Sequence, residues 1–492
     1  MARNRTGSTR SRVIGAGAIG LAVVVLVAAS AVSVVADKTT PARLVDGSVE
    51  VVAEPGVPDS VLVSRTVFAS SSTAVVVAQA ANASDVRAAA DLARAKRVPV
   101  FVLAESTAPA VSTELRRLGV TQAVRIGAAT APVDVPETTD TDLPGDAVST
   151  GSGTLVLLAD SDSDTVAAVA TAEAGAAEVI SMPVADPRSS GEALARMRAK
   201  PAMPVRAIGA NFGTVEQFKQ QLNLARNVQE LPGGGQLMFP SRRVVALYGS
   251  PGAPELGPLG RQSIPDSIKK AKALAAKYQK FSPVPVVPGF EIIVTVASAE
   301  PGPGGNYTSA LDVEKIRPWV DAAGKAGVYV TLDLQPGRMN FLKQAKMYRD
   351  LLLEPHVGLA LDPEWRLKPN QVHLTQIGSV APAEVNQVST WLADIVASQN
   401  LPQKALVLHQ FDADMLGDRS KIDTRRPELS FVIHADGHGV PSVKMETYRR
   451  IVAGIPPRTW LGWKNFYTED KPMFSPRKTM AVDPVPYFIS YQ

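Results

Sequence analysis

The chain has 492 residues, of which 45% are hydrophobic and 20% are charged, and its formal net charge is +4. This composition is that of a soluble globular protein, and the length favours two or three domains. The charge is slight and no cluster of Lys or Arg alternates with aromatic residues, so nucleic acid is not expected as a partner. There is no cysteine. This excludes disulfides, thiolate metal sites, a cysteine nucleophile and a lipid anchor on cysteine.

An uncharged apolar run follows a basic N-terminus. Four arginines lie in residues 1–12, and residues 13–36 consist mostly of Val, Ala, Gly, Ile and Leu. The run is long enough to cross a bilayer, for which about 20 residues are needed. The arginines are expected to stay in the cytoplasm as a basic tail, which places the chain from Asp37 onward outside the membrane.

The length of this apolar run favours an uncleaved single-pass anchor in the cell membrane. The alternative is a signal peptide cleaved after Val34-Val35-Ala36, which would leave a protein secreted to the cell wall. In both cases the body of the protein is exported. An exported chain without cysteine and rich in Ala and Val is typical of an actinobacterial envelope protein.

Residues 37–59 are predicted to be a linker and residues 60–230 an α/β domain with two similar units. The first unit is predicted as Ala74–Ala78 (strand), Asp85–Ala93 (helix), Val98–Leu103 (strand), a helix ending at Gly119, and Val124–Gly127 (strand). The second unit is predicted as Leu155–Asp160 (strand), Asp164–Ala170 (helix), Glu178–Pro183 (strand) and Val205–Gly209 (strand). Strands that alternate with amphipathic helices predict parallel α/β layers.

Parts of the first unit resemble the cell-wall-binding repeat 2 family of exported Gram-positive proteins. The resemblance is carried by the Asp85–Leu92 helix, the Val98–Leu103 strand, the Leu115-x-x-Leu118-Gly119 turn and the Val124–Gly127 strand. It implies that the domain binds an anionic wall polymer. The family usually carries three repeats, whereas two are found here. The alternative is a plain α/β spacer that holds a catalytic domain away from the membrane.

A glycine-rich stretch at residues 231–237 predicts a flexible, protease-sensitive linker before a second domain at residues 238–492. Eight strands are predicted in this domain: Val244–Tyr248, Glu291–Ala297, Val328–Leu334, Val357–Leu361, Ala405–His409, Leu429–His434, Thr459–Trp463 and Tyr487–Ser490. Helices are predicted at Ile264–Lys280, Ala310–Ala326, Asn340–Leu353, Ala383–Gln399 and Val443–Ile455. The count and size match a (β/α)8 TIM barrel, with no clear helix in the fifth and seventh connections.

The fourth of these strands is followed directly by Asp362-Pro363-Glu364-Trp365. Alternation along a strand would point Asp362 and Glu364 the same way, roughly 7 Å apart. Paired carboxylates at about that separation act on glycosidic bonds. The alternative is that Pro363 begins a loop and both acids are solvated. Asp333, after the third strand, is the backup carboxylate, whereas Glu469 on a distant loop is expected to matter less.

Other predicted strands also end in polar or aromatic side chains, and in a barrel these ends converge on the face where active sites are built. The candidate substrate-binding residues are Tyr248, Gln335, Trp365, His409, Gln410, Asp412, His434, Asp436, Trp463 and Tyr467. Tryptophan at a strand end is typical of sugar binding, and it is equally typical of packing at the barrel rim.

The Asp362-Pro363-Glu364 ending resembles the Asp-x-Glu that follows the fourth strand in a lysozyme family of TIM-barrel muramidases. The aromatic last strand, which ends in Gln492, is a weaker similarity, and the proline between the acids departs from the pattern. The resemblance implies a glycoside hydrolase that acts on a cell-wall polysaccharide and needs no cofactor. In it Glu364 would donate the proton, and Asp362 would stay ionised and stabilise or attack the anomeric centre.

Two other functions stay open. A metal-dependent polysaccharide deacetylase or hydrolase would use His434, Asp436 and His438 together with His409 and Asp412, because nitrogen and oxygen ligands suit zinc. A non-catalytic wall-binding protein on a degenerate barrel is the second alternative. The carboxylate pair is favoured over both, and no metal is expected.

Overall fold

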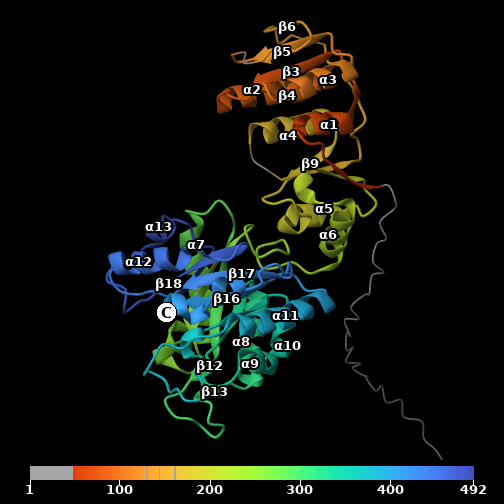
Figure 1. Ribbon diagram of the computed structural model, residues 1–492. Helices are drawn as coiled ribbons and strands as arrows, with labels where there is room; N and C mark the ends of the chain where they lie inside the picture. Colours follow the sequence, from red (N-terminus) through yellow and green to blue (C-terminus); the bar gives the residue numbers. More distant parts are fainter. Residues whose placement is uncertain (1–47, 129–130, 143, 160–161) are drawn as a thin grey trace, which may run out of the picture. The chain divides into compact units, whose positions relative to one another are not determined.

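The computed structural model describes residues 48–128, 131–142, 144–159 and 162–492. Within these ranges no helix is both long and apolar enough to cross a membrane. The basic tail and the anchor predicted at residues 13–36 lie outside the described residues. The described chain is mixed α/β, with two small parallel sheets followed by a closed parallel barrel (Figure 1).

The two small sheets have the same strand order. The first is ordered β4-β3-β5-β6 and the second β9-β8-β10-β1, so the first strand of each unit lies between its second and third. This confirms the predicted strands of both units and their parallel pairing. The strands are β3 (Thr73–Ala78), β4 (Val100–Leu103), β5 (Gln122–Ile126), β6 (Glu137–Thr138), β8 (Leu155–Leu158), β9 (Glu178–Ser181) and β10 (Val205–Ile208).

The fourth strand of the second sheet comes from the start of the domain. β1 (Val49–Val52) pairs in parallel with β10, so this part of the range predicted as a linker belongs to the folded domain. A short antiparallel pair of β2 (Phe68–Ser70) and β7 (Val148–Ser149) completes the strands of this domain. The helices are α1 (Asp59–Val67), α2 (Ala83–Lys96), α3 (Ala108–Leu118), α4 (Ser163–Ala174), α5 (Gly191–Ala199) and α6 (Val215–Asn227).

The segment predicted as a flexible linker, residues 231–237, is tied down by Arg242. Arg242 is only 1% exposed. Its guanidinium donates hydrogen bonds to the backbone carbonyls of Pro232, Gly234 and Leu237. Burial lowers the pKa of Arg242 to about 10, which leaves it charged at neutral pH. The segment is therefore ordered, because a buried cation takes the place of water as the donor to its carbonyls.

All eight predicted strands of the second domain are confirmed, and they form a closed barrel. Every neighbouring pair is parallel, and β11 pairs with both β12 and β19, which closes the sheet. The short β13 (Thr308–Ala310) adds antiparallel to β12 outside the barrel. The barrel strands are β11 (Arg243–Gly249), β12 (Val286–Ala297), β14 (Tyr329–Leu334), β15 (Val357–Leu361), β16 (Lys404–Gln410), β17 (Leu429–Ala435), β18 (Thr459–Asn465) and β19 (Phe488–Tyr491).

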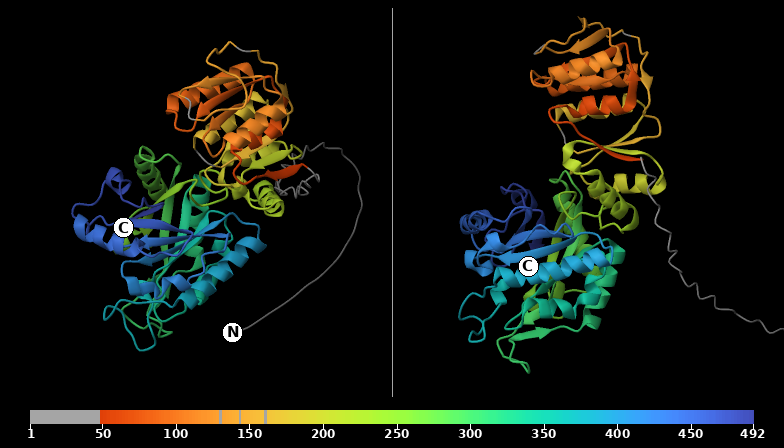
Figure 2. Two further views of the ribbon diagram at one scale, coloured as in Figure 1. Left: turned by 45° about the horizontal axis from the view of Figure 1, so that its top comes forward. Right: turned by 45° about the vertical axis from the view of Figure 1, so that its right-hand side comes forward.

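Helices connect most of these strands and lie outside the barrel (Figure 2). They are α7 (Ile264–Gln279), α8 (Val313–Ala326), α9 (Phe341–Met347), α10 (Arg349–Leu352), α11 (Pro382–Ser398), α12 (Pro441–Val452) and α13 (Pro476–Thr479). The fifth connection holds only the 3-10 turns η6 (Ala413–Leu416) and η7 (Arg419–Lys421), and the seventh holds only the four-residue α13. The predicted irregularity of these two connections is confirmed.

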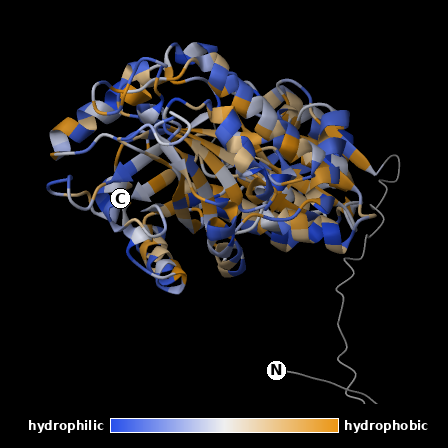
Figure 3. Ribbon diagram, turned by 90° about the horizontal axis from the view of Figure 1, so that it is seen from below, coloured by the Kyte–Doolittle hydropathy of each residue, from blue (hydrophilic) through white to orange (hydrophobic). Residues whose placement is uncertain are grey.

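Alternation along the strands separates two layers of core. Val244, Ala246 and Val407 point into the barrel and pack with Phe488. The intervening residues, such as Val245, pack outward against the helices. The strands are coloured largely as apolar in Figure 3, whereas the outer helices alternate between apolar and polar residues, as expected for helices with one buried face.

Replacing Arg242 with Met is expected to destabilise the protein by about 2–4 kcal/mol, because three buried carbonyls lose their donor. The same change should open residues 231–237 to proteases. Urea unfolding measures the first effect, and limited proteolysis with mass mapping of the fragments measures the second. Arg349→Met, at an exposed position on α10, is the control. Equal cleavage of the wild type and the Arg242 variant within this segment would contradict the tethering role.

Candidate active site

The residues that point into the barrel change from apolar to ionisable towards the carboxyl ends of the strands. His409 lies two residues after Val407, and His434 lies two residues after Val432, so each imidazole faces the interior like the valine before it. The same alternation brings a set of buried polar side chains together at this end of the barrel. This charged layer consists of Tyr248, Glu291, Asp333, Asp362, His409, His434, Asp436, Lys464 and Ser490.

His409 lies at the centre of the charged layer and is fully buried. Its Nδ1 is 2.6 Å from Asp436 Oδ2, and its Nε2 is 3.0 Å from Glu291 Oε1. Burial alone would lower the pKa of His409, but the carboxylates of Asp436, Glu291 and Asp333 raise it well above the ordinary value. Both ring nitrogens therefore carry protons, and the imidazolium donates one hydrogen bond to each acid.

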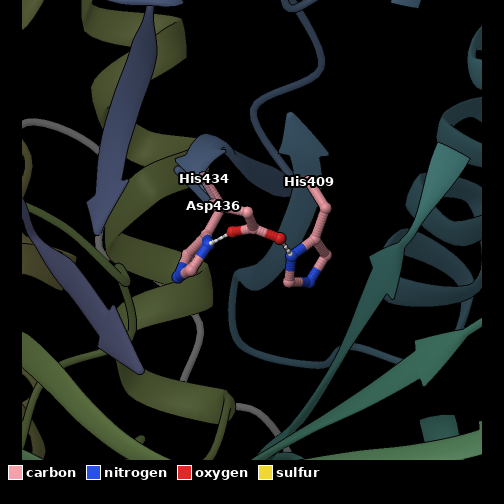
Figure 4. A group of neighbouring side chains, drawn as sticks. All are labelled: His409, His434 and Asp436. Atoms are coloured by element: carbon pink, nitrogen blue, oxygen red, sulfur yellow. Dashed lines mark hydrogen bonds and ion pairs between the residues drawn. The ribbon is translucent and has the colours of Figure 1, made fainter. Parts of the chain in front are cut away.

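Asp436 lies between two histidine rings (Figure 4). Its second oxygen accepts a short hydrogen bond from Nδ1 of His434, and the ammonium of Lys464 lies 3.7 Å from Oδ2. Burial would raise the pKa of Asp436, but His409, Lys464 and His434 together hold it well below the usual range. These cations therefore favour the ionised form of Asp436.

Ser490, His434 and Asp436 are linked in the order of a Ser-His-Asp nucleophilic site. The hydroxyl of Ser490 is 3.2 Å from Nε2 of His434. Ser490 is fully buried, however, and it does not line the pocket described below. The backbone also closes around the ring, since a Cβ at Gly462 would collide with His434. The arrangement fits a hydrogen-bonded barrel interior better than a serine nucleophile.

The side chains of His409, His434 and Asp436 could also hold a metal ion, since one ligand atom from each lies within 4.8 Å of the others. All four imidazole nitrogens already have hydrogen-bond partners. Both oxygens of Asp436 accept from these rings, and the cation of Lys464 adjoins the group. A metal would have to displace these bonds and the second proton of His409. The donor set therefore favours a hydrogen-bonded cluster over a metal centre.

A pocket of about 460 Å³ opens above the charged layer at the carboxyl ends of the strands. Its volume lies within the range of about 300–1,000 Å³ that is usual for small-molecule sites. The residues that line it are Tyr248, Leu256, Ile293, Val296, Ala297, Gln335, Asp362, Glu364, Trp365, Phe411, Asp436, Gly437, His438, Thr447, Arg450, Lys464, Phe466, Glu469 and Gln492.

Asp362 and Glu364 both line this pocket, although not for the reason predicted. β15 ends at Leu361, and Pro363 begins the 3-10 turn η5 (Pro363–Trp365), so strand alternation does not set the directions of the two acids. In the part of the chain that the structure describes, neither carboxyl group has a hydrogen-bond partner. The predicted strand geometry is wrong, and Pro363 leaves the strand as in the alternative, but both acids line one pocket instead of being merely solvated.

The pKa values of these two acids are shifted in the same direction. Burial and the neighbouring Asp333 raise the pKa of Asp362 well above its ordinary value. Burial also raises the pKa of Glu364, with Lys464 acting against it. The expectation that Asp362 stays ionised is therefore not supported, because its carboxyl group is almost fully buried among other acids. Among the acids of the lining, the pKa is instead lowered for Asp436 and, through a hydrogen bond with Thr468, for Glu469.

Three further predicted site residues lie beneath the pocket or in its wall. Asp333 lies beneath the pocket, where burial raises its pKa and Tyr248 donates a 2.7 Å hydrogen bond to it. Gln335 lies in the wall and accepts a hydrogen bond from the backbone of Ala297. Trp365 also lies in the wall.

Six predicted binding residues do not line the pocket: His409 and His434 lie in the charged layer, and Trp463, Gln410, Asp412 and Tyr467 lie elsewhere. Trp463 faces the helices, because Lys464 takes the inward position on β18. Gln410 likewise points out of the barrel, next to the inward His409, and is fully buried. Asp412 caps the turn η6, and Tyr467 lies at the surface with 39% exposure.

Three residues of the charged layer, Glu291, Lys464 and Ser490, were not predicted as site residues. Glu291 and Lys464 each stand alone as a charge within an otherwise apolar strand, and that isolation was the signal available in the sequence. Glu469 was expected to lie far from the site, but it lines the pocket.

Replacing Asp362 with Asn is expected to stabilise the protein at neutral pH. The folded pKa of Asp362 is raised above its unfolded value of about 3.9. Between these two values the folded protein keeps a proton that the unfolded chain has lost, so the free energy of unfolding falls as pH rises from about 4. Asn does not titrate, so the advantage of the variant should grow between pH 4 and pH 7 in urea unfolding.

Asp350→Asn, which changes an exposed carboxylate on α10, is the control for this stability experiment and should show no such pH-dependent gain. A constant difference between wild type and the Asp362 variant from pH 4 to pH 7 would contradict the raised pKa.

No protein-family model matches this chain, and no match is found among curated proteins or among solved structures. The resemblances to cell-wall-binding repeats and to TIM-barrel muramidases therefore stay predictions that rest on their short motifs. What the chain is shown to be is a mixed α/β protein with a closed, eight-stranded parallel barrel of the TIM type.

Proposed function

We propose that this protein is a glycoside hydrolase that acts on a polysaccharide of the cell envelope. One observation carries the proposal. The pocket holds acids whose pKa values are driven apart, since those of Asp362 and Glu364 are raised while that of Asp436 is lowered. Acids of opposite protonation in one site are what glycosidic bond cleavage needs, because one must give a proton and another must stay negative.

Glu364 is assigned as the proton donor. It lies in the pocket wall with part of its side chain accessible, whereas Asp362 lies deeper and is almost fully buried. Its raised pKa keeps it protonated closer to neutral pH than an ordinary glutamate. Since its carboxyl group has no hydrogen-bond partner within the described chain, the proton is free to pass to the oxygen of a leaving sugar.

Asp436 is assigned as the negative charge that stabilises the oxocarbenium-like transition state. It lines the pocket, and His409 and His434 hold both its oxygens in place. Such preorganisation avoids the cost of reorienting the group during the reaction. Asp362, which is protonated, is then a hydrogen-bond donor to a sugar hydroxyl at the floor of the pocket.

Aromatic side chains support a carbohydrate substrate. Trp365, Phe411 and Phe466 line the same pocket as the acids. Flat rings stack against the apolar faces of sugars, so they could hold a glycan across the acid pair.

The envelope location and the wall polymer as partner rest on the sequence alone. They depend on the basic tail and the apolar run at residues 13–36 and on the resemblance of the N-terminal domain to wall-binding repeats. A membrane-attached hydrolase with its barrel outside the cell is the arrangement that these features favour.

Replacing Glu364 with Gln removes the proton donor but keeps the size of the side chain. Turnover is expected to fall on the order of 10²–10⁴-fold, with little change in substrate binding. The measurement is the release of oligosaccharides from fractionated cell-wall glycans by the fragment from Asp37 onward. Glu446→Gln, at an exposed position on α12, is the matched control and should keep full turnover.

Full activity of the Glu364 variant on a substrate that the wild type cleaves would refute the assignment. Tight glycan binding by the wild type without any turnover over days would instead favour the non-catalytic wall-binding alternative.

Turnover is also expected to survive exhaustive treatment with a chelator, because the nitrogens of His409 and His434 are engaged in hydrogen bonds. Activity assays before and after chelation, with metal analysis of the purified protein, make the comparison. Loss of activity that added zinc restores would favour the metal-dependent deacetylase or hydrolase instead.

A further inference from the structure

Lys464 is a buried cation whose hydrogen-bonding capacity is unused. Its side chain is 5% exposed and lines the pocket. The closest carboxylate oxygen, Oδ2 of Asp436, is 3.7 Å from Nζ, which is outside hydrogen-bonding distance. Among the described residues the ammonium otherwise contacts only ring faces, with Nζ 3.7 Å from the centroid of Tyr248 and 5.4 Å from that of Phe466. Since Lys464 lines the pocket, a ligand that fills the pocket must supply the acceptor that its ammonium would otherwise find in solvent.

A second cation lies in the wall of the same pocket. Arg450 lies on α12, the helix that leads into the strand of Lys464, and is exposed. Its guanidinium donates a 3.0 Å hydrogen bond to the backbone carbonyl of Phe411. It forms no ion pair with any carboxylate in the described part of the chain, so most of its donors remain free. Thr447, one turn earlier on α12, also faces the pocket.

The acids of the pocket attract Lys464 electrostatically, but in the described chain they accept no hydrogen bond from either cation. Asp436 already accepts hydrogen bonds from two histidines, and Asp362 and Glu364 act on Lys464 through charge without a hydrogen bond to it. Glu469 is the remaining acid of the lining, and it is mostly exposed to solvent. The side of the pocket built by α12 and β18 thus offers two cations with free donors.

We infer that this pocket binds a glycan unit that carries a negatively charged substituent, a carboxylate or a phosphate, and that Lys464 and Arg450 bind that group. This inference rests on the proposed function and names the class of its substrate. A neutral sugar hydroxyl could satisfy one donor of Lys464. It would leave the guanidinium of Arg450 without a counterion, whereas an anion is complementary to both.

The test uses two pairs of sugars that differ mainly by one carboxylate. The first pair is N-acetylglucosaminyl-N-acetylmuramic acid and N,N′-diacetylchitobiose, and the second is methyl glucuronide and methyl glucoside. Binding is measured by titration calorimetry on the Glu364→Gln protein, so that no turnover is needed. In at least one pair the acidic sugar should bind on the order of tenfold more tightly, with a preference that weakens as salt is added.

Lys464→Gln and Arg450→Gln, each made in the same background, should reduce that preference to less than about twofold. Lys269→Gln, at an exposed position on α7, removes a lysine charge elsewhere and should leave the preference for the acidic sugar unchanged. Because Lys464 lies in the charged layer, its variant is checked for folding by circular dichroism. If the Lys464 variant does not fold, the variant of the exposed Arg450 supplies the test.

Equal affinity for the acidic and neutral members of both pairs would overturn the inference, as would a preference that survives both substitutions. Either result leaves the hydrolase proposal standing, because turnover by the wild type is measured separately. Conversely, a wild-type protein that prefers the acidic sugars but cleaves no glycan would refute the hydrolase proposal and support the anion site.

Discussion

Two ionised acids share the interior of the barrel, and the imidazolium of His409 joins them. It donates to Asp436 on one side and to Glu291 on the other. Lys464, whose pKa is raised by the surrounding acids despite its burial, supplies the second positive charge. Two anions are thereby matched by two cations in a place that excludes water. Removing His409 would leave Lys464 as the remaining one of these two cations beside two buried carboxylates, and the loss of one partner of a buried ion pair typically costs about 3–5 kcal/mol.

The protonation of the pocket acids follows from this balance. With both positive charges matched by Glu291 and Asp436, a further ionised acid in the layer would be uncompensated, and burial together with the neighbouring acids raises the pKa values of Asp333 and Asp362. The hydrogen-bond network that balances the buried charges thus also sets the pKa values of the pocket acids. If the pocket is the hydrolase site proposed above, its stability and its chemistry depend on the same hydrogen bonds.

The barrel could be predicted from the sequence because each strand is a short apolar run closed by turns or helices. All eight strands were found in this way, and so were the two connections without a long helix. The site was harder to predict, because register decides which of two neighbours points inward. On β18 the prediction chose the aromatic Trp463, whereas alternation from Gly462 places Lys464 inside.

The second error of prediction concerns the geometry of Asp362 and Glu364, and Pro363 explains it. It ends the strand at Leu361, so the period-two geometry assumed for Asp362 and Glu364 did not apply. The raised pKa of Asp362 could not be predicted from the sequence either. It depends on burial and on Asp333 and His409, which come from other strands. Spacing along one segment carries no information on contacts of that kind.

The pairing of β1, the first strand of the N-terminal domain, affects the order in which that domain folds. β1 is made early, yet its partner β10 comes much later, and Arg206 reaches back to the carbonyl of Ser48 across 158 residues. A chain that emerges N-terminus first must therefore hold an unpaired strand while the whole first unit is produced. Contacts of such long range are slow to form. The second sheet is thus expected to be completed late, once β10 has been made.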